Sequence, residues 1–516
     1  MDKTRQNPAQ SLIARSGVAT IAGLFSQQVA SSPDHLAIVD GARRMSYREL
    51  EERTNRLANV LLNQGLGAGA RVAILSRNRL EYLELELAAA KAGLIVAALN
   101  WRLAKREMAH CITLVNPDLI LVEPALSDQL AALDIPSVDR ITIGEDYENQ
   151  LSQASPEAPV CDLDPEMGLI ILYTSGTTGL PKGALISHRA LIARAMSFAS
   201  ELQLPRQDTF CAWAPLYHMA STDHSLASLI RGGTVHVVDG YQPEKMIEFL
   251  AENETGLFFL LPGMVRRFID DWRKKGARAR GLVACGAMAD LVPPEDIAEV
   301  TALLNAPYFN SFGSTETGLP PASASFLEIG KLPKSLSKKQ SAMCELRLVD
   351  DDDIDVAPGT PGEVALRGPT LFSGYWNADT TNLKDFRNGW FHMGDVMRRN
   401  PDGTLDYVDR KKYMIKSGGE NIYPAEIEAV LLTDPGVAQA IVVKQADATW
   451  GEVPVAFVVP KDTLDPAALQ EHCTSHLSRY KRPKRIILIQ DSDIPRSTTG
   501  KVQRHVLEEK LGRSQI

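Results

Sequence analysis

The first part of the chain shows two alternating apolar patterns, one of strand length and one of helical period. The stretch Ser46-Tyr-Arg-Glu49 has the form of a capping box, and the helix that it begins would place Leu50, Leu57 and Leu61 on one face. The two patterns alternate at residues 71–75, 81–92, 94–99, 233–238, 244–252, 257–261, 264–274, 282–285 and 295–304. Repeated strand–helix units predict an α/β fold with helices on both faces of its sheets.

The pattern changes near residue 322, where Gly and Pro become denser and the apolar runs become short. Short runs separated by turn residues predict strands, so we expect a small β-rich subdomain over residues 323–409. From residue 423 the pattern is a helix, two strands, a helix and a strand, which suffices for a compact α+β domain. We therefore expect a large N-terminal domain over residues 1–409 and a small, mobile C-terminal domain over residues 410–516.

Composition and charge narrow the class of protein. The 516 residues are 44% hydrophobic and 23% charged, which is ordinary for a globular protein of several domains. A net charge of −9 argues against a general nucleic-acid binder. The six cysteines form no Cys-x-x-Cys pair, so we expect neither a zinc cluster nor a disulfide framework. No signal core and no apolar run of about 18 residues is present, so we expect a cytoplasmic protein without a membrane span.

Two charged stretches allow a plain interpretation and a functional one. The four aspartates at residues 350–353 are expected to form a solvated turn, with a metal site as the alternative. The lysine-rich residues 331–339 are expected to form a solvated loop, with a patch for a phosphate group as the alternative.

A glycine- and hydroxyl-rich stretch, Tyr173-Thr-Ser-Gly-Thr-Thr-Gly-Leu-Pro-Lys-Gly183, lies between strand-like runs at residues 169–173 and 184–186. Its glycines would let backbone N–H groups point at an anion, and Lys182 would add positive charge. It lacks the Gly-Lys-Ser/Thr ending of a Walker loop, and the next helix begins only near residue 187. These residues alone leave two interpretations open, a phosphate loop and a polar hairpin.

Further segments, in order along residues 46–504, resemble the motifs of the adenylate-forming superfamily, which includes acyl-CoA synthetases, peptide-synthetase adenylation domains and luciferases. Besides the glycine-rich stretch they are Ala214-Pro-Leu-Tyr-His-Met219, Phe312-Gly-Ser-Thr-Glu316, Pro361-Gly-Glu-Val-Ala-Leu-Arg-Gly368, Gly389-Trp-Phe-His-Met-Gly-Asp395, Asp409-Arg-Lys-Lys-Tyr-Met-Ile-Lys-Ser-Gly-Gly419 and Pro495-Arg-Ser-Thr-Thr-Gly-Lys501. The resemblance implies a two-step reaction. A carboxylate attacks the α-phosphate of ATP to give acyl-AMP and pyrophosphate, and a thiol, usually that of coenzyme A, then displaces AMP.

For the first step the resemblance implies an ATP site. Its residues would be Thr174, Ser175, Gly176, Thr177, Thr178, Gly179, Lys182, Gly286, Ala287, Phe312, Asp395 and Arg410. Phe312 would stack on adenine, Asp395 would accept hydrogen bonds from the ribose hydroxyls, and Arg410 would support the same nucleotide.

The resemblance also implies four catalytic residues. Glu316 would be associated with Mg²⁺, which neutralises the charge that develops as pyrophosphate leaves. Thr315 would contact the α-phosphate, and Lys501 would contact both the carboxylate and the α-phosphate oxygens. His218 would act as a gate beside the bound acid, although a packed histidine is the plain alternative.

Further residues are expected in the acid pocket and at the domain hinge. His218, His224 and Ser311 would line the pocket, and a polar wall would disfavour a simple alkyl tail. Lys412 would be the hinge about which the C-terminal domain rotates. Gly418 and Gly419 would then let the backbone line a narrow pantetheine tunnel, unless they simply form a turn.

Three stretches depart from the family pattern. Cys285 and Met288 are unusual within Ala284-Cys-Gly-Ala-Met288, and Ser311 stands where glycine is common. Residues 330–343 are longer and richer in lysine than the turn that is usual there. The first two departures, at Cys285 and Met288 and at Ser311, bear on the shape of the acid pocket, and so on which acid is used.

The expected function is an ATP-dependent carboxylic acid–CoA ligase that uses ATP, Mg²⁺ and coenzyme A, acts on a fatty or aromatic carboxylate, and exists as a monomer or homodimer. Three alternatives remain. They are a stand-alone adenylation enzyme that loads a carrier protein, a luciferase-like oxygenase, and a degenerate nucleotide-binding protein.

Overall fold

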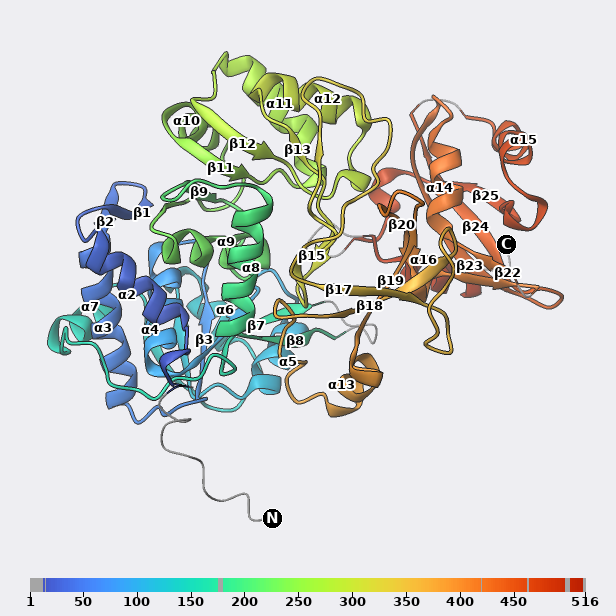
Figure 1. Ribbon diagram of the computed structural model, residues 1–516. Coiled ribbons are helices and arrows are strands. Elements are labelled where there is room, and N and C mark those ends of the chain that lie inside the picture. The colour runs from blue at the N-terminus through green and yellow to red at the C-terminus, as the bar shows by residue number, and fades with distance from the viewer. Residues whose placement is uncertain are drawn as a thin grey trace. The chain divides into compact units, whose positions relative to one another are not determined.

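The computed structural model describes residues 13, 15–174, 180–418, 420–461, 464–496 and 502–513 (Figure 1). The chain divides into two compact units. The first comprises Met1–Glu345 and Arg367–Arg387, and the second comprises Leu346–Leu366 and Asn388–Ile516. This division places the strands after residue 387 with the C-terminal residues, and the expected boundary at residues 409 and 410 stays a prediction. The predicted site residues outside the described part are Ser175, Gly176, Thr177, Thr178, Gly179, Gly419 and Lys501.

A six-stranded sheet, in the order β6-β5-β3-β4-β7-β8, forms one layer of the first unit. Its strands are β3 (Arg71–Leu75), β4 (Ile95–Leu99), β5 (Leu119–Val122), β6 (Asp139–Thr142), β7 (Gly168–Thr174) and β8 (Lys182–Ser187). All neighbours are parallel except β7 and β8, which are antiparallel. The glycine-rich stretch therefore links two strands, as predicted, and helix α8 (His188–Glu201) begins only after β8.

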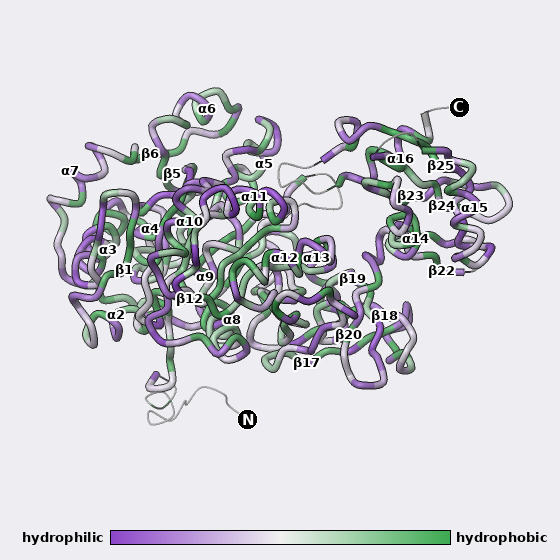
Figure 2. Tube along the Cα trace, turned by 90° about the horizontal axis from the view of Figure 1, so that it is seen from above, coloured by the Kyte–Doolittle hydropathy of each residue, from purple (hydrophilic) through white to green (hydrophobic). Residues whose placement is uncertain are grey.

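An eight-stranded sheet, in the order β16-β13-β12-β11-β9-β10-β1-β2, forms the second layer of strands in this unit. Its members are β1 (Leu36–Asp40), β2 (Arg43–Ser46), β9 (Thr209–Ala212), β10 (Thr234–Val237), β11 (Glu254–Phe258), β12 (Gly281–Cys285), β13 (Tyr308–Phe309) and β16 (Phe326–Leu327). Its helices are α10 (Pro243–Glu252), α11 (Val265–Lys275) and α12 (Pro294–Leu304). Figure 2 shows the hydrophilic stretch of α11, whose apolar side chains Phe268 and Trp272 are buried.

Helices α3 (Tyr47–Asn63), α4 (Leu80–Ala92) and α9 (Met219–Ile230) pack together with α8 inside the first unit. The predicted capping box is confirmed. The Glu49 N–H donates to Ser46 Oγ at 3.3 Å, and the Ser46 N–H donates to Glu49 Oε2 at 2.7 Å. Every residue of α4 is buried, and the helix ends at Gly93 in the left-handed conformation.

The second unit contains two sheets. One has the order β17-β18-β19-β20, from β17 (Glu345–Val349), β18 (Pro361–Arg367), β19 (Phe391–Arg399) and β20 (Leu405–Arg410). The other has β22-β21-β24-β23, with β25 beside β24, from β21 (Ile415–Ser417), β22 (Glu420–Ile422), β23 (Val437–Asp447), β24 (Gly451–Pro460) and β25 (Arg485–Leu488). Helices α14 (Pro424–Leu432), α15 (Pro466–His476) and α16 (Arg504–Arg513) pack with the second sheet. The α/β fold with a small C-terminal α+β part is thus confirmed.

Two expectations for charged stretches have different outcomes. Asp350 closes a turn, because its Oδ1 accepts the N–H groups of Asp352 at 2.9 Å and Ile354 at 3.0 Å. The expectation of a solvated lysine-rich loop is wrong at Lys338, whose side chain has no exposed surface. Within the described part of the chain, no helix has the length and apolar character that a bilayer crossing requires.

Glu86 on α4 makes the stability of the fold depend on pH. It lies in the interior, where Thr222 Oγ1 donates to its Oε1, and burial raises its pKa from 4.5 to about 8. The folded state therefore holds a proton that the unfolded chain releases above pH 4.5. Linkage then lowers the free energy of unfolding as pH rises from 4.5 to 8, by up to about 1.4 kcal/mol per pH unit.

We expect Glu86→Gln to remove this pH-dependent loss of stability, because glutamine is neutral at every pH. Thermal or urea unfolding at pH 5 and pH 8.5 measures the free energy of unfolding. This free energy should equal that of the wild type at pH 5 and exceed it at pH 8.5, while Glu52→Gln, at an exposed position, should follow the wild-type pH dependence. Parallel curves for Glu86→Gln and the wild type would contradict the assignment.

Candidate active site

Lys182 and Glu316 are both in contact with one tyrosine. Lys182 begins β8, and its Nζ lies 3.8 Å from the centroid of the Tyr375 ring and 3.9 Å from Asp385 Oδ2. The Tyr375 hydroxyl donates to Glu316 Oε1 at 2.8 Å. Tyr375 therefore joins the predicted phosphate-binding lysine to the predicted metal-associated carboxylate. The sequence interpretation missed Tyr375, because no motif of that interpretation includes it.

Backbone hydrogen bonds hold Tyr375 in this place. The Trp376 N–H donates to the Gly183 carbonyl at 2.8 Å, and the Phe372 N–H donates to the Glu316 carbonyl at 2.9 Å. A Cβ at Gly183 would lie only 2.9 Å from an Ile171 methyl group, so a residue with a side chain would push this strand away. The segment that carries Tyr375 is thus fastened to both β8 and the Glu316 loop.

A second group of predicted residues gathers where β12 and β13 end. These strands are parallel neighbours, so their carboxyl ends lie at the same sheet edge. Gly286 has φ +82°, and a Cβ there would lie 2.2 Å from the Tyr308 ring. The Tyr308 hydroxyl donates to the Ala287 carbonyl at 2.9 Å, and the Met288 N–H donates to Ser311 Oγ at 3.1 Å. The structure therefore brings Gly286, Ala287 and Ser311 together.

Arg194 supports the loop that carries Thr315. Its Nη2 donates to the Thr315 carbonyl at 3.1 Å, and its Nη1 lies 2.9 Å from Asp223 Oδ2 in an ion pair that is buried on both sides. Removing one partner of such a pair leaves an uncompensated buried charge. Arg194 thus fixes the loop against α8 and α9, although it stands in no motif of the sequence interpretation.

The two predicted pocket histidines have different surroundings. His218 is half-buried and caps α9, with its Nδ1 accepting the Ala220 N–H at 3.2 Å. His224 is buried, with its ring centroid 4.3 Å from that of Phe198, 5.8 Å from Phe210 and 4.7 Å from Phe259.

Burial sets the charge of His224. Neither of its ring nitrogens has a hydrogen-bond partner among the described residues. Burial, with a smaller effect of Arg194, lowers its pKa to about 3. The imidazole is therefore neutral at neutral pH. That His218 and His224 face the acid stays a prediction.

In the second unit, Asp395 and Arg410 form an ion pair. They are register partners on β19 and β20, and Arg410 Nε lies 2.7 Å from Asp395 Oδ1. The Asp395 side chain is 2% exposed and that of Arg410 is 41% exposed, so the guanidinium lies at the surface above a buried carboxylate. This arrangement holds the carboxylate in one orientation.

The hinge prediction falls on residues with defined local contacts. The Lys412 ammonium lies 4.9 Å from the centroid of the Tyr413 ring, and burial, followed by the charge of Arg410, lowers its pKa. Gly418 has φ +58°, and a Cβ there would lie 2.8 Å from Trp450 Cε3. A larger residue at 418 would therefore collide with Trp450 as well as adopt a strained backbone.

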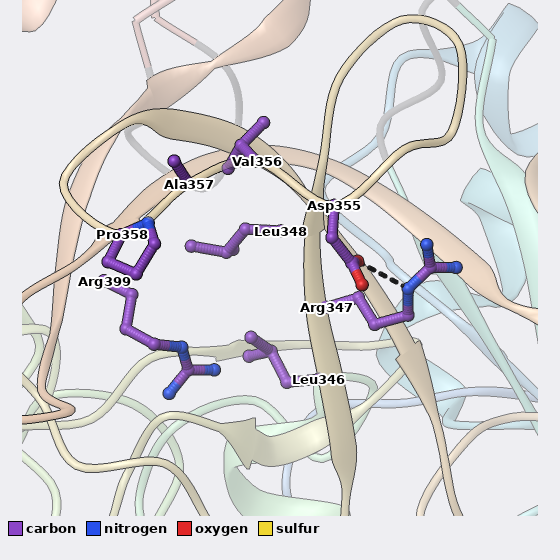
Figure 3. A pocket seen from close by; sticks show the side chains of 8 residues that line it. All are labelled: Leu346, Arg347, Leu348, Asp355, Val356, Ala357, Pro358 and Arg399. Atoms are coloured by element: carbon purple, nitrogen blue, oxygen red, sulfur yellow. Dashed lines mark hydrogen bonds and ion pairs between the residues drawn. The ribbon is translucent and has the colours of Figure 1, made fainter.

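The second unit also contains a pocket of about 200 Å³. Figure 3 shows Arg347 and Asp355 on one side of it and Arg399 on the other, with Arg347 Nε 2.7 Å from Asp355 Oδ1. Its lining residues are Leu346, Arg347, Leu348, Asp355, Val356, Ala357, Pro358 and Arg399. No predicted site residue lines this pocket, so we assign it no part in the site.

Comparison with known proteins adds to this geometry. The family model described as AMP-binding enzyme matches residues 25–376, and that described as AMP-binding enzyme C-terminal domain matches residues 426–501. The chain is 33% identical over 497 residues to an indoleacetate–CoA ligase of Aromatoleum aromaticum, covering 93% of this chain and 96% of that one. It is 30% identical over 501 residues to a long-chain-fatty-acid–CoA ligase of Mycobacterium tuberculosis, covering 95% and 98%.

A solved structure has the same fold. The Bacillus subtilis o-succinylbenzoate CoA synthetase, in complex with its acyl-adenylate intermediate, superposes with a TM-score of 0.81 at 25% identity. The match covers 94% of this chain and 97% of that one.

Replacing Tyr375 tests whether it positions Glu316 and Lys182. Tyr375→Phe removes the hydroxyl that donates to Glu316 but keeps the ring beside Lys182. We expect the Kd for ATP in the presence of Mg²⁺ to rise about tenfold, since a hydrogen bond to a charged group contributes about 1.5 kcal/mol or more.

Calorimetric titration with and without Mg²⁺ measures this effect. Tyr375→Phe should lose affinity mainly when Mg²⁺ is present, whereas Tyr375→Leu, which also removes the ring, should lose affinity under both conditions. An equal loss in both conditions for Tyr375→Phe would remove the proposed link to the metal.

Proposed function

This chain belongs to the AMP-binding enzyme family, and we propose that it is an ATP-dependent ligase that joins a carboxylic acid to coenzyme A. In the first step an oxygen of the acid attacks the α-phosphorus of ATP, and pyrophosphate leaves. In the second step the thiol of coenzyme A attacks the acyl carbon, and AMP leaves. The contact of Tyr375 with both Lys182 and Glu316 is the observation that carries the proposal.

The residues of the first unit suit the binding of a nucleoside triphosphate together with Mg²⁺. Mg²⁺ is commonly bound by one or two carboxylates together with substrate phosphates, and Glu316 is a half-buried carboxylate held near the cation Lys182 through Tyr375. When bound, Mg²⁺ would neutralise the phosphates. We assign Lys182 to the phosphates, Glu316 to the metal and Thr315 to the α-phosphate.

The nucleoside and the acid take further residues in this proposal. Gly286, Ala287 and Phe312 hold adenine, while Asp395 accepts hydrogen bonds from the ribose with Arg410 as its partner. Lys501 contacts the oxygens between which the new bond forms, where a compact ammonium offsets the converging negative charge.

The acid is a fatty or aromatic carboxylate. We place it beside α9, with His218 and Ser311 at the pocket and His224 behind it. The rings of Phe198, Phe210 and Phe259 around His224 favour the aromatic class, because aromatic rings pack well at offset or edge-on angles. The indoleacetate–CoA ligase relative fits this choice.

The second step needs a different set of residues. We propose that the chain rotates at Lys412, that Lys501 leaves, and that Gly418 and Gly419 line the path of the pantetheine thiol. Domain rotations of this kind often limit turnover. We propose that the protein is located in the cytoplasm. We also propose that it exists as a monomer or a homodimer.

The test is an incubation of the purified chain with ATP, Mg²⁺ and a panel of acids, with and without coenzyme A. The panel includes fatty acids of three length classes, benzoates, cinnamates and arylacetates. We expect pyrophosphate release and a thioester of the matching mass with one class of acid. Pyrophosphate without thioester would indicate a carrier protein as acceptor, and silence with every acid would contradict the ligase proposal.

Lys501→Ala tests the assignment of the first step. We expect acyl-AMP formation to fall by about 10²–10³, the usual cost of removing a group that stabilises a charged transition state. ATP binding should stay measurable by calorimetry, because the other nucleotide contacts remain. An unchanged rate of acyl-AMP formation would remove Lys501 from the mechanism.

A further inference from the structure

Lys338 is buried, unlike its neighbours in the lysine-rich segment. Its side chain has no exposed surface, whereas Lys334 and Lys339 are exposed and the Lys331 side chain is 69% exposed. A buried ammonium is costly unless it is paired and hydrogen-bonded. The surroundings of Lys338 must therefore supply that pairing.

Three oxygens surround the Lys338 ammonium. Nζ lies 2.6 Å from Asp290 Oδ2, 2.8 Å from Asn310 Oδ1 and 3.1 Å from the Leu336 carbonyl. An ammonium carries three N–H donors, so these three acceptors match its capacity. The Asn310 amide in turn donates to the carbonyls of Leu336 at 3.0 Å and Ser337 at 3.2 Å.

These partners lie beside two stretches that depart from the family pattern, the one that contains Met288 and the predicted acid-pocket residue Ser311. Asp290 follows Met288 by two positions, and Asn310 directly precedes Ser311. The Met288 N–H donates to Ser311 Oγ, so the same two segments also meet there. Lys338 thus ties together the loop after β12 and the chain after β13 from inside the protein.

Met288 has a backbone conformation that needs such support. Its φ is +49°, in the left-handed region that a residue with a side chain adopts only at a cost. Strained residues persist where the surroundings hold them, and they concentrate at functional sites. Here the Ser311 hydrogen bond on one side and the Asp290–Lys338 ion pair on the other confine Met288.

We propose that Lys338 is a positioning residue that sets acid selectivity, by fixing the spacing between the Met288–Asp290 loop and the Asn310–Ser311 segment. The proposal rests on the ligase function proposed above. Lys338 does not touch the reacting atoms in this assignment. It acts through Asp290 and Asn310, which place Met288 and Ser311 at the pocket.

The test uses the full chain, the best acid from the panel, and homologues of that acid that are one carbon shorter and longer. The variant Asp290→Ala/Lys338→Met removes both charges, so no unpaired ion is left in the interior. Lys339→Met, in the exposed neighbouring lysine, is the matched control. Steady-state pyrophosphate release gives kcat and KM for each acid and for ATP, and thermal unfolding reports stability.

We expect the double variant to lose at least tenfold in kcat/KM for the best acid and to change its ranking of the three acids, with the KM for ATP within threefold of wild type. Lys339→Met should keep the wild-type values. A purely structural role would lower the unfolding temperature and leave the ranking unchanged, and that result would overturn the proposal.

A second variant decides the matter if the double variant does not fold. Asp290→Ala removes the carboxylate, whose side chain is 26% exposed, and leaves Lys338 its acceptors Asn310 Oδ1 and the Leu336 carbonyl. A changed ranking of the acids in Asp290→Ala supports the proposal, and an unchanged ranking overturns it. Failure of the ligase function itself is distinguishable, because the wild type would then be silent with every acid.

Discussion

The interior of the first unit depends on the pairing of charges that the fold has buried. Helix α4 is buried along its entire length, yet it carries Glu81, Glu84 and Lys91, each of which forms an ion pair. Lys91 Nζ alone contacts Glu51, Thr54 and Asn55, all on α3. Since an unpaired ion in the interior is far costlier than an unpaired neutral group, these contacts fix how α3 and α4 lie against each other.

Polar side-chain contacts also fix the loops of the candidate site. Arg194 reaches from α8 to Asp223 on α9 and to the Thr315 carbonyl, and Tyr375 reaches from the edge of β8 to Glu316. In each case one side chain satisfies polar groups from two different parts of the chain. The segment that carries Thr315 and Glu316 is therefore tied to α8 and to the segment that carries Tyr375.

The features that could be predicted from the sequence are those that depend on neighbouring residues. The capping box at Ser46, the strand at residues 71–75 and the link between two strands at residues 173–183 each follow from neighbouring residues. Tyr375 and Lys338 escaped prediction because their partners are distant. Tyr375 lies 59 positions from Glu316, and Lys338 lies 28 positions from Asn310. A lysine among several lysines is expected to be solvated, because the sequence does not show that the fold places a carboxylate beside it.

The ion pair of buried Lys338 with the partly exposed Asp290 also constrains how this chain can evolve. A substitution of Asp290 alone passes through a state in which the Lys338 ammonium is left inside the protein without its carboxylate. Two simultaneous changes avoid that state, but they are rare under ordinary mutation. The loop after β12 is thus separated from alternative sequences by an epistatic barrier, and libraries that randomise positions 290, 310 and 338 together would cross it where single-site libraries would not.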